Sequence, residues 1–136
     1  MIPKFRAWDV HNMEMFTNAQ LIIWNGNVYA NDPGKISVDK MRGWSIDEKY
    51  LMQSTGLLDK NGVEIFEGDV VKCYIVTEKD ECEYVGVVCF KDFSFVIVDE
   101  KDTYDPLWNY KSGFVDIETE IEIIGNIYKN PELMEG

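Results

Sequence analysis

The stretch YVGVVCFKDFSFVIV, residues 84–98, decides the fold class. Its two apolar runs, residues 84–90 and 93–98, are rich in β-branched residues and too short to form buried helices. Lys91 and Asp92 connect them. In each run, apolar residues occupy both sets of alternating positions, which point to opposite faces of a strand. The stretch therefore predicts a pair of strands buried on two sides at the centre of a β-sheet.

The segments around this pair continue the same pattern, with turn residues at intervals of about eight to twelve residues. The sequence VDIETEIEI, residues 115–123, alternates apolar and acidic residues and predicts a strand buried on one face. No long helical period is present, although Ser45, with Glu48 three residues later, is typical of the N-cap of one helical turn. The acidic segments 77–83 and 99–113 predict exposed loops. Further strands are expected over residues 50–54, 63–66 and 70–76.

Residues 1–45 differ in character from the rest of the chain. They carry five basic and four acidic residues, whereas residues 46–136 carry eight basic and twenty-one acidic residues. Asn25-Gly26 supplies the positive φ angles of a tight hairpin turn, and two short strands are expected on either side of His11 and Asn12. We therefore expect a mainly β protein, in which residues 46–136 form an SH3-like, partly open β-barrel core and residues 1–45 form a β-hairpin-rich N-terminal extension.

The composition limits the classes of partner and the location. With 46% apolar residues in a chain of 136, the protein can bury a core as one compact domain. Its net charge of −12 repels phosphate groups, which argues against direct binding to nucleic acid or to an anionic membrane. No apolar run approaches the roughly 18 residues needed to span a bilayer, and no basic and apolar leader precedes the first strand, so we expect a cytoplasmic protein.

The residues that could carry catalysis do not form a recognisable set. His11 is the only histidine and has no obvious serine or cysteine partner, and neither glycine-rich phosphate-binding pattern occurs. The three cysteines have spacings of nine and seven residues, which fit no zinc site, and are expected to be free thiols: Cys73, Cys82 and Cys89. We therefore assign no catalytic, cofactor-binding or metal-binding residue, and we expect no cofactor.

One enzymatic alternative stays open. Asp59, Glu67 and Asp69 are carboxylates close together in the sequence DKNGVEIFEGD, and clustered carboxylates can hold Mg²⁺ in a metal-dependent hydrolase or nuclease. The spacing does not fit a calcium-binding EF-hand loop, because Gly62 and Val70 fall where that loop needs other residues. Two tight turns explain these acids better.

Four acidic residues line the polar face of the strand expected at 115–123: Asp116, Glu118, Glu120 and Glu122. Carboxylates at every second position of a strand lie about 6.6 Å apart, and such a row can imitate a phosphate backbone. This pattern predicts, as a second alternative, an acidic DNA-mimic inhibitor of a nucleic-acid-binding host protein. The competing interpretation is a solvated strand face, whose charges prevent pairing between sheet edges.

Three tryptophans lie in or beside the N-terminal extension: Trp8, Trp24 and Trp44. This short segment has little sequence with which to cover its aromatic side chains, and an uncovered aromatic patch is typical of a contact surface. We therefore expect these tryptophans and the four acidic residues of 116–122 to contact a partner. The expected partners are further copies of the chain, in a homo-oligomer, and a host or phage protein.

Three stretches together resemble the YopX family of phage and prophage proteins: KFRAWD at residues 4–9, LMQSTGLLDKNGVEIFEGDVV at 51–71 and IIGNIYKNPEL at 123–133. The resemblance implies a mostly β fold and a phage or prophage origin, with no established biochemical activity and no catalytic residue to carry over. Gly62 and Gly68 stand where turns need them, so the shared motifs are expected to be scaffold. The expected function is that of an uncharacterised phage-encoded accessory protein, a non-catalytic protein-binding or oligomeric module.

Overall fold

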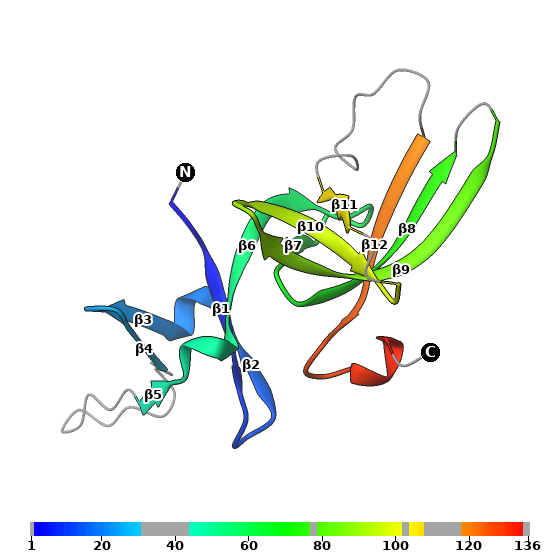
Figure 1. Cartoon of the computed structure of the whole chain (residues 1–136). Helices are drawn as coiled ribbons and strands as arrows, with labels where there is room; N and C mark the ends of the chain where they lie inside the picture. The colour runs from blue at the N-terminus through cyan, green and yellow to red at the C-terminus, as the bar shows by residue number, and fades with distance from the viewer. Residues whose placement is uncertain (1, 31–43, 77–78, 102–103, 108–117, 135–136) are drawn as a thin grey trace. The chain divides into compact units, whose positions relative to one another are not determined.

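The computed structural model describes residues 2–30, 44–76, 79–101, 104–107 and 118–134, with the backbone alone at residues 44 and 118 (Figure 1). The described residues form strands joined by turns and short 3₁₀ segments, and none of them lies in an α-helix. The expected mainly β fold class is therefore confirmed. No described helix is long and apolar enough to cross a membrane.

The contacts within the chain divide it into two compact units, Met1–Ser54 and Thr55–Gly136. The division falls inside strand β6 (Leu51–Leu58). The first residues of β6 pair in antiparallel register with β1 (Phe5–Asp9), and its other neighbour in the sheet is β7 (Glu64–Phe66). Each unit has its own buried apolar side chains.

The N-terminal unit is built from hairpins. Its strands before β6 are β1, β2 (Glu14–Phe16), β3 (Leu21–Trp24), β4 (Asn27–Ala30) and β5 (Trp44–Ile46). β1 pairs with β2, and β3, β4 and β5 form a three-stranded antiparallel sheet in that order. The turn between β3 and β4 is formed by Asn25 and Gly26, whose φ angles are 50° and 77°. The hairpins expected here are therefore confirmed. The buried apolar side chains of the unit, including one from β6, are Ala7, Trp8, Phe16, Val28, Ala30 and Met52.

The helical turn expected after Ser45 is present but begins later. Ser45 lies in β5, where it is opposite Tyr29 of β4, and this pairing keeps it extended. The helical segment is the 3₁₀ helix η2 (Glu48–Tyr50), and its N-cap is Asp47, whose carboxylate accepts a hydrogen bond from the Lys49 N–H. The Ser45 cap is therefore wrong, because sheet pairing takes precedence over a local capping pattern.

The C-terminal unit contains a curled five-stranded antiparallel sheet in the order β11-β10-β9-β8-β12, which has a barrel-like form (Figure 1). Its strands are β8 (Asp69–Val76), β9 (Glu81–Lys91), β10 (Ser94–Asp99), β11 (Tyr104–Pro106) and β12 (Glu118–Asn126). Apolar side chains from these strands and from β7 form the core of the unit: Ile65, Val71, Cys73, Val88, Ile97, Leu107 and Ile121. The chain ends on the short 3₁₀ helix η4 (Pro131–Met134).

The central strand pair is confirmed as β9 and β10, with Phe90 opposite Phe95. Burial on both faces is confirmed only in part. The neighbouring residues Val96 and Ile97 point to opposite faces of β10 and are both buried, whereas Val87 and Cys89 of β9 are half-buried and Phe90 near its end is exposed. Complete burial needs elements that cover both faces of a sheet, and no α-helix among the described residues does so. The loops expected at 77–83 and 99–113 are also interrupted by structure, since β9 begins at Glu81 and β11 pairs with β10.

Candidate functional site

The acidic strand face expected at residues 115–123 belongs to β12 where the structure describes it. Asp116 lies outside the described residues, and Glu118 is described in its backbone alone. Glu120 is exposed and Glu122 half-buried, whereas Ile121 between them is buried in the core. The alternation of apolar and acidic faces is therefore confirmed over this part of the strand.

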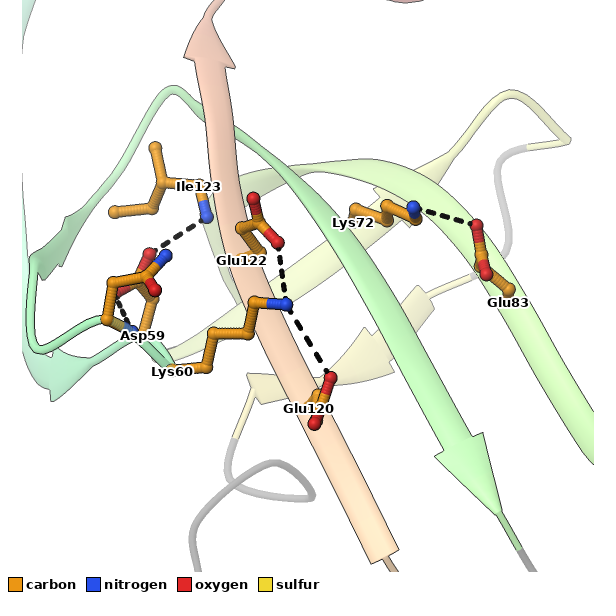
Figure 2. A network of polar contacts seen from close by, with 8 residues as sticks. Asp59, Lys60, Lys72, Glu83, Glu120, Glu122 and Ile123 are labelled. Atoms are coloured by element: carbon orange, nitrogen blue, oxygen red, sulfur yellow. Dashed lines mark hydrogen bonds and ion pairs between the residues drawn. The ribbon is translucent and has the colours of Figure 1, made fainter.

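Lysine side chains lie among these acids (Figure 2). Lys60 Nζ, from the turn after β6, lies 2.9 Å from a carboxylate oxygen of Glu122 and 3.7 Å from one of Glu120. On the neighbouring strands, Lys72 Nζ of β8 lies 3.2 Å from a carboxylate oxygen of Glu83 on β9. The described surface thus alternates positive and negative charge. It does not present the unbroken negative row on which the DNA-mimic alternative depends.

The Lys60 ion pairs give the first testable expectation. A hydrogen bond and the charge of Glu122, with a smaller contribution from Glu120, raise the pKa of Lys60 above its ordinary value of 10.5. Glu122→Gln removes the larger of these influences, so the pKa of Lys60 should fall toward 10.5. An NMR titration of the Lys60 side chain measures this directly. Glu83→Gln is the matched control, because Glu83 pairs with Lys72 instead; an equal fall in that variant would contradict the assigned pairing.

Asp59, one of the carboxylates considered for a metal site, binds backbone amides. One oxygen, Oδ1, accepts hydrogen bonds from the N–H groups of Asn61 and Val63, each at 2.9 Å. The other, Oδ2, accepts one at 3.1 Å from the N–H of Ile123 on β12 (Figure 2). The Lys60 N–H donates to the carbonyl of Ile121, so the turn after β6 is fastened to β12 by two hydrogen bonds. The role that this geometry gives Asp59 is structural.

The neighbouring family motifs are structural in the same way. Asp69 is buried and accepts a hydrogen bond from the Phe66 N–H at 2.8 Å. The Gly68 N–H donates to the carbonyl of Val88, and the carbonyl of Gly68 accepts from the Ile127 N–H. Within the described parts of the chain, no three His, Cys, Asp or Glu side chains are grouped so that they could hold a metal ion. Asp59 and Asp69 therefore direct their oxygens at the backbone of the fold.

The three tryptophans considered for partner contact lie in different environments. Trp24, at the end of β3, is 72% exposed, so its side chain offers a contact surface. Trp8 is only 4% exposed and belongs to the buried set of the N-terminal unit. Little of the Trp8 side chain is therefore open to a partner in this structure, and a partner contact at this residue stays a prediction. Trp44 begins β5, and its side chain lies outside the described part of the structure.

The three cysteines are free, as expected. Cys73 is buried in the core, and Cys89 is half-buried, where desolvation raises the pKa of its thiol despite the opposing charge of Lys91. Cys82 is exposed and lies within β9. The raised pKa of Cys89 disfavours a reactive thiolate at that position.

A cavity of about 510 Å³ in the N-terminal unit is a site that the sequence does not reveal. Three segments line it: the end of β1 with the following turn, the turn between β3 and β4, and β5 with η2. Its charged and titratable lining groups are Asp9, His11, Asp47 and Glu48, and its aromatic lining groups are Trp8 and Tyr50. Its size is within the range of about 300 to 1,000 Å³ that is usual for small-ligand sites.

Asp9 is held rigidly beside this cavity. It is 4% exposed, and its Oδ1 accepts hydrogen bonds from the backbone N–H groups of His11 at 3.0 Å and Asn12 at 3.4 Å. Its Oδ2 accepts one from the side-chain amide of Asn12 at 2.7 Å. These hydrogen bonds fix the orientation of the carboxylate. His11 itself is exposed in the turn, as expected.

Comparisons with known proteins agree with the fold. A family model described as YopX protein matches residues 4–135. The structure of protein EF1440 from Enterococcus faecalis is 29% identical in sequence, with 98% of this chain and 99% of that chain covered and a TM-score of 0.63. The structure of protein yopX from Bacillus subtilis is 25% identical, with 96% of each chain covered and a TM-score of 0.58. Among curated proteins, none matches this chain.

Proposed function

The chain belongs to the YopX family, and we propose that it is a non-catalytic binding module that associates with further copies of itself through the outer edge of β3. A phage or prophage origin, a cytoplasmic location in the host cell, and a host or phage protein as a further partner are part of the same proposal. The structural role of Asp59 and Asp69 supports a binding function over a metal-dependent hydrolase.

The observation that carries the proposal is the composition of β3. This strand is an edge of its sheet, and all four of its residues, Leu21–Trp24, are apolar. Ile22, Ile23 and Trp24 are exposed, although successive side chains point to opposite faces of the strand. Edge strands of monomeric proteins usually carry a lysine, a proline or a bulge that prevents pairing with another chain. β3 has neither lysine nor proline, so the same strand of a second copy can pair with it.

The distribution of charge favours the same edge. The N-terminal unit, residues 1–54, contains six basic and six acidic residues and is neutral overall, so the C-terminal unit carries the whole net charge of −12. Two copies therefore repel each other through their C-terminal units and can approach through their N-terminal units. A neutral, apolar edge in the neutral unit is the surface at which self-association costs least.

Light scattering tests the proposal. At micromolar concentration the protein should have a mass above the 15.8 kDa of the monomer, and Ile23→Lys should return it to that mass by placing a charge on the paired edge. Phe93→Ser is the matched control, because Phe93 is 96% exposed on a hairpin of the C-terminal unit. A monomeric parent protein, or a loss of mass in the Phe93 variant instead, would overturn the assignment of β3.

A further inference from the structure

We propose that the cavity of the N-terminal unit binds an organic cation, a guanidinium or alkylammonium group carried on a short chain. The inference rests on the lining of the cavity and does not depend on self-association through β3. Among the described lining residues, three carry carboxylates, Asp9, Asp47 and Glu48, and none is a lysine or arginine. This local excess of negative charge lies within a unit whose basic and acidic residues are equal in number.

The three carboxylates that line the cavity differ in how far they are buried. Asp9 is buried and fixed by its hydrogen bonds from His11 and Asn12. Asp47 and Glu48 are exposed, at the start of η2. All three carboxylates line the same cavity, and the charge of the buried Asp9 is screened less by water than the charges of the exposed Asp47 and Glu48. Charge pairing strengthens as water is excluded, so the buried group discriminates a cation from a neutral ligand most strongly.

The aromatic part of the lining suits the same ligand. Tyr50 and Trp8 line the cavity, and because Lys49 Nζ lies 5.0 Å from the centroid of the Tyr50 ring and occupies one face of it, a bound cation would have to use the rest of this aromatic lining. Aromatic rings attract ammonium and guanidinium groups through their quadrupoles and also cover the methylene groups that carry them. The apolar side chains of Val28 and Ile46 complete a surface for such a chain. Charge, aromatic lining and volume thus agree on an amphipathic cation rather than a bare metal ion.

An NMR titration with a matched pair of peptides tests the inference. The probes are Ac-Gly-Arg-Gly-NH₂ and the same peptide with citrulline, which is a neutral isostere of arginine. The arginine peptide should shift the backbone amides of His11, Asn27 and Glu48 saturably, with a dissociation constant on the order of 1 mM, as befits a small ligand. The citrulline peptide should shift them weakly. Equal shifts from both peptides, or no saturable shift at these amides, would overturn the proposal.

A pair of double variants separates the cavity from the general attraction of cations to an acidic protein. Asp47→Asn with Glu48→Gln removes two charges from the cavity, and the asparagine still offers an acceptor to the Lys49 N–H. This variant should bind the arginine peptide about fivefold more weakly, given the modest strength of exposed charge pairs. Glu120→Gln with Glu122→Gln removes two charges from the C-terminal unit and should leave the affinity unchanged. Equal weakening in both variants would show nonspecific attraction and overturn the site.

A third titration, with butylguanidinium, identifies the source of the cation. Binding of the peptide at least as tight as that of butylguanidinium assigns the cavity to an arginine side chain of a polypeptide. Binding of butylguanidinium alone assigns it to a free small cation, and both results support a cation site. Because these shifts are measured on the N-terminal cavity in each case, their absence would leave the self-association through β3 standing on its own test.

Discussion

Replacing Asp59 with alanine is expected to destabilise the protein by about 3 kcal/mol or more, because each hydrogen bond to a charged acceptor contributes roughly 1.5 to 3 kcal/mol after competition with water is taken into account. The carboxylate of Asp59 accepts three such bonds, from Asn61, Val63 and Ile123, and the residue is 7% exposed. Two of the bonds close the turn after β6. The third joins that turn to β12, a strand 64 residues further along the chain. Urea denaturation of the parent and the variant measures the loss.

Asp59→Asn separates the charge from the hydrogen bonds. Asparagine has the same shape but only one acceptor oxygen, so in either orientation its NH₂ group faces a backbone N–H that Asp59 now satisfies. The cost should be smaller than that of alanine if the acceptor keeps the bonds within the turn. Asp80→Asn is the matched control, since Asp80 is exposed and accepts from the adjacent Glu81 N–H. If Asp80→Asn lowered the free energy of unfolding as much as Asp59→Asn does, a special role for Asp59 would be contradicted.

The carboxylate of Asp59 also predicts how the stability of the folded protein changes at low pH. Burial raises the pKa of Asp59 and is the largest single influence, but the backbone hydrogen bonds from Val63, Ile123 and Asn61, with the charge of Lys60, together outweigh it. The pKa therefore lies below its ordinary value of 3.8 in the folded protein. The stabilisation by Asp59 is complete above the unfolded pKa and is lost as the pH falls through the folded pKa. The stability difference between parent and Asp59→Asn should be constant above about pH 5 and shrink below about pH 4.

Local sequence was sufficient for most strands and for the hairpin turn between β3 and β4, but not for β11 or the first residues of β9, which fall in segments expected as loops. Asn25-Gly26 specifies a turn because few other pairs adopt two positive φ angles cheaply, and the structure has this turn. The alternation around Ile121 specifies which face of β12 is buried. Ser45 shows the limit, because its capping pattern is local whereas its pairing with Tyr29 depends on a strand from an earlier part of the chain.

The candidate sites depend on such distant pairings and could not be predicted. The cavity is lined by residues 8–11, 26–28, 45–48 and 50, which come together only when β5 pairs with β4 and β6 pairs with β1. The ion pair of Glu122 with Lys60, from the turn after β6, is likewise not indicated by any spacing in the sequence. One signal was available at Asp59, since an aspartate that opens an Asp-Lys-Asn-Gly turn bonds its own backbone. Its bond to Ile123 was not visible from that turn.

Gly86→Ala is expected to cost about 3 kcal/mol, near the upper end of the roughly 1 to 3 kcal/mol for overpacking a core. Gly86 lies on β9, between Val71 of β8 and Asp99 of β10. A Cβ at this position would lie 2.5 Å from Cγ2 of Ile97 and 2.9 Å from the carbonyl oxygen of Val98. Ile97 is fully buried and the carbonyl belongs to the paired strand, so neither can move without disturbing the β9–β10 pair.

Gly86→Ala also has a stabilising effect, through the entropy of the unfolded chain, which should be smaller than the cost of the steric clash. Alanine restricts the unfolded chain more than glycine does, which stabilises a strand position by roughly 0.5 to 1 kcal/mol where the side chain fits. Gly62→Ala isolates backbone strain from steric clash, because Gly62 has a φ angle of +81° but no atom within 4 Å of its added Cβ. This comparator should cost about 1 kcal/mol through its left-handed conformation alone. Thermal and urea denaturation of both variants decide the matter, since a Gly86→Ala variant no less stable than Gly62→Ala would mean that β9 and β10 can separate to admit a methyl group.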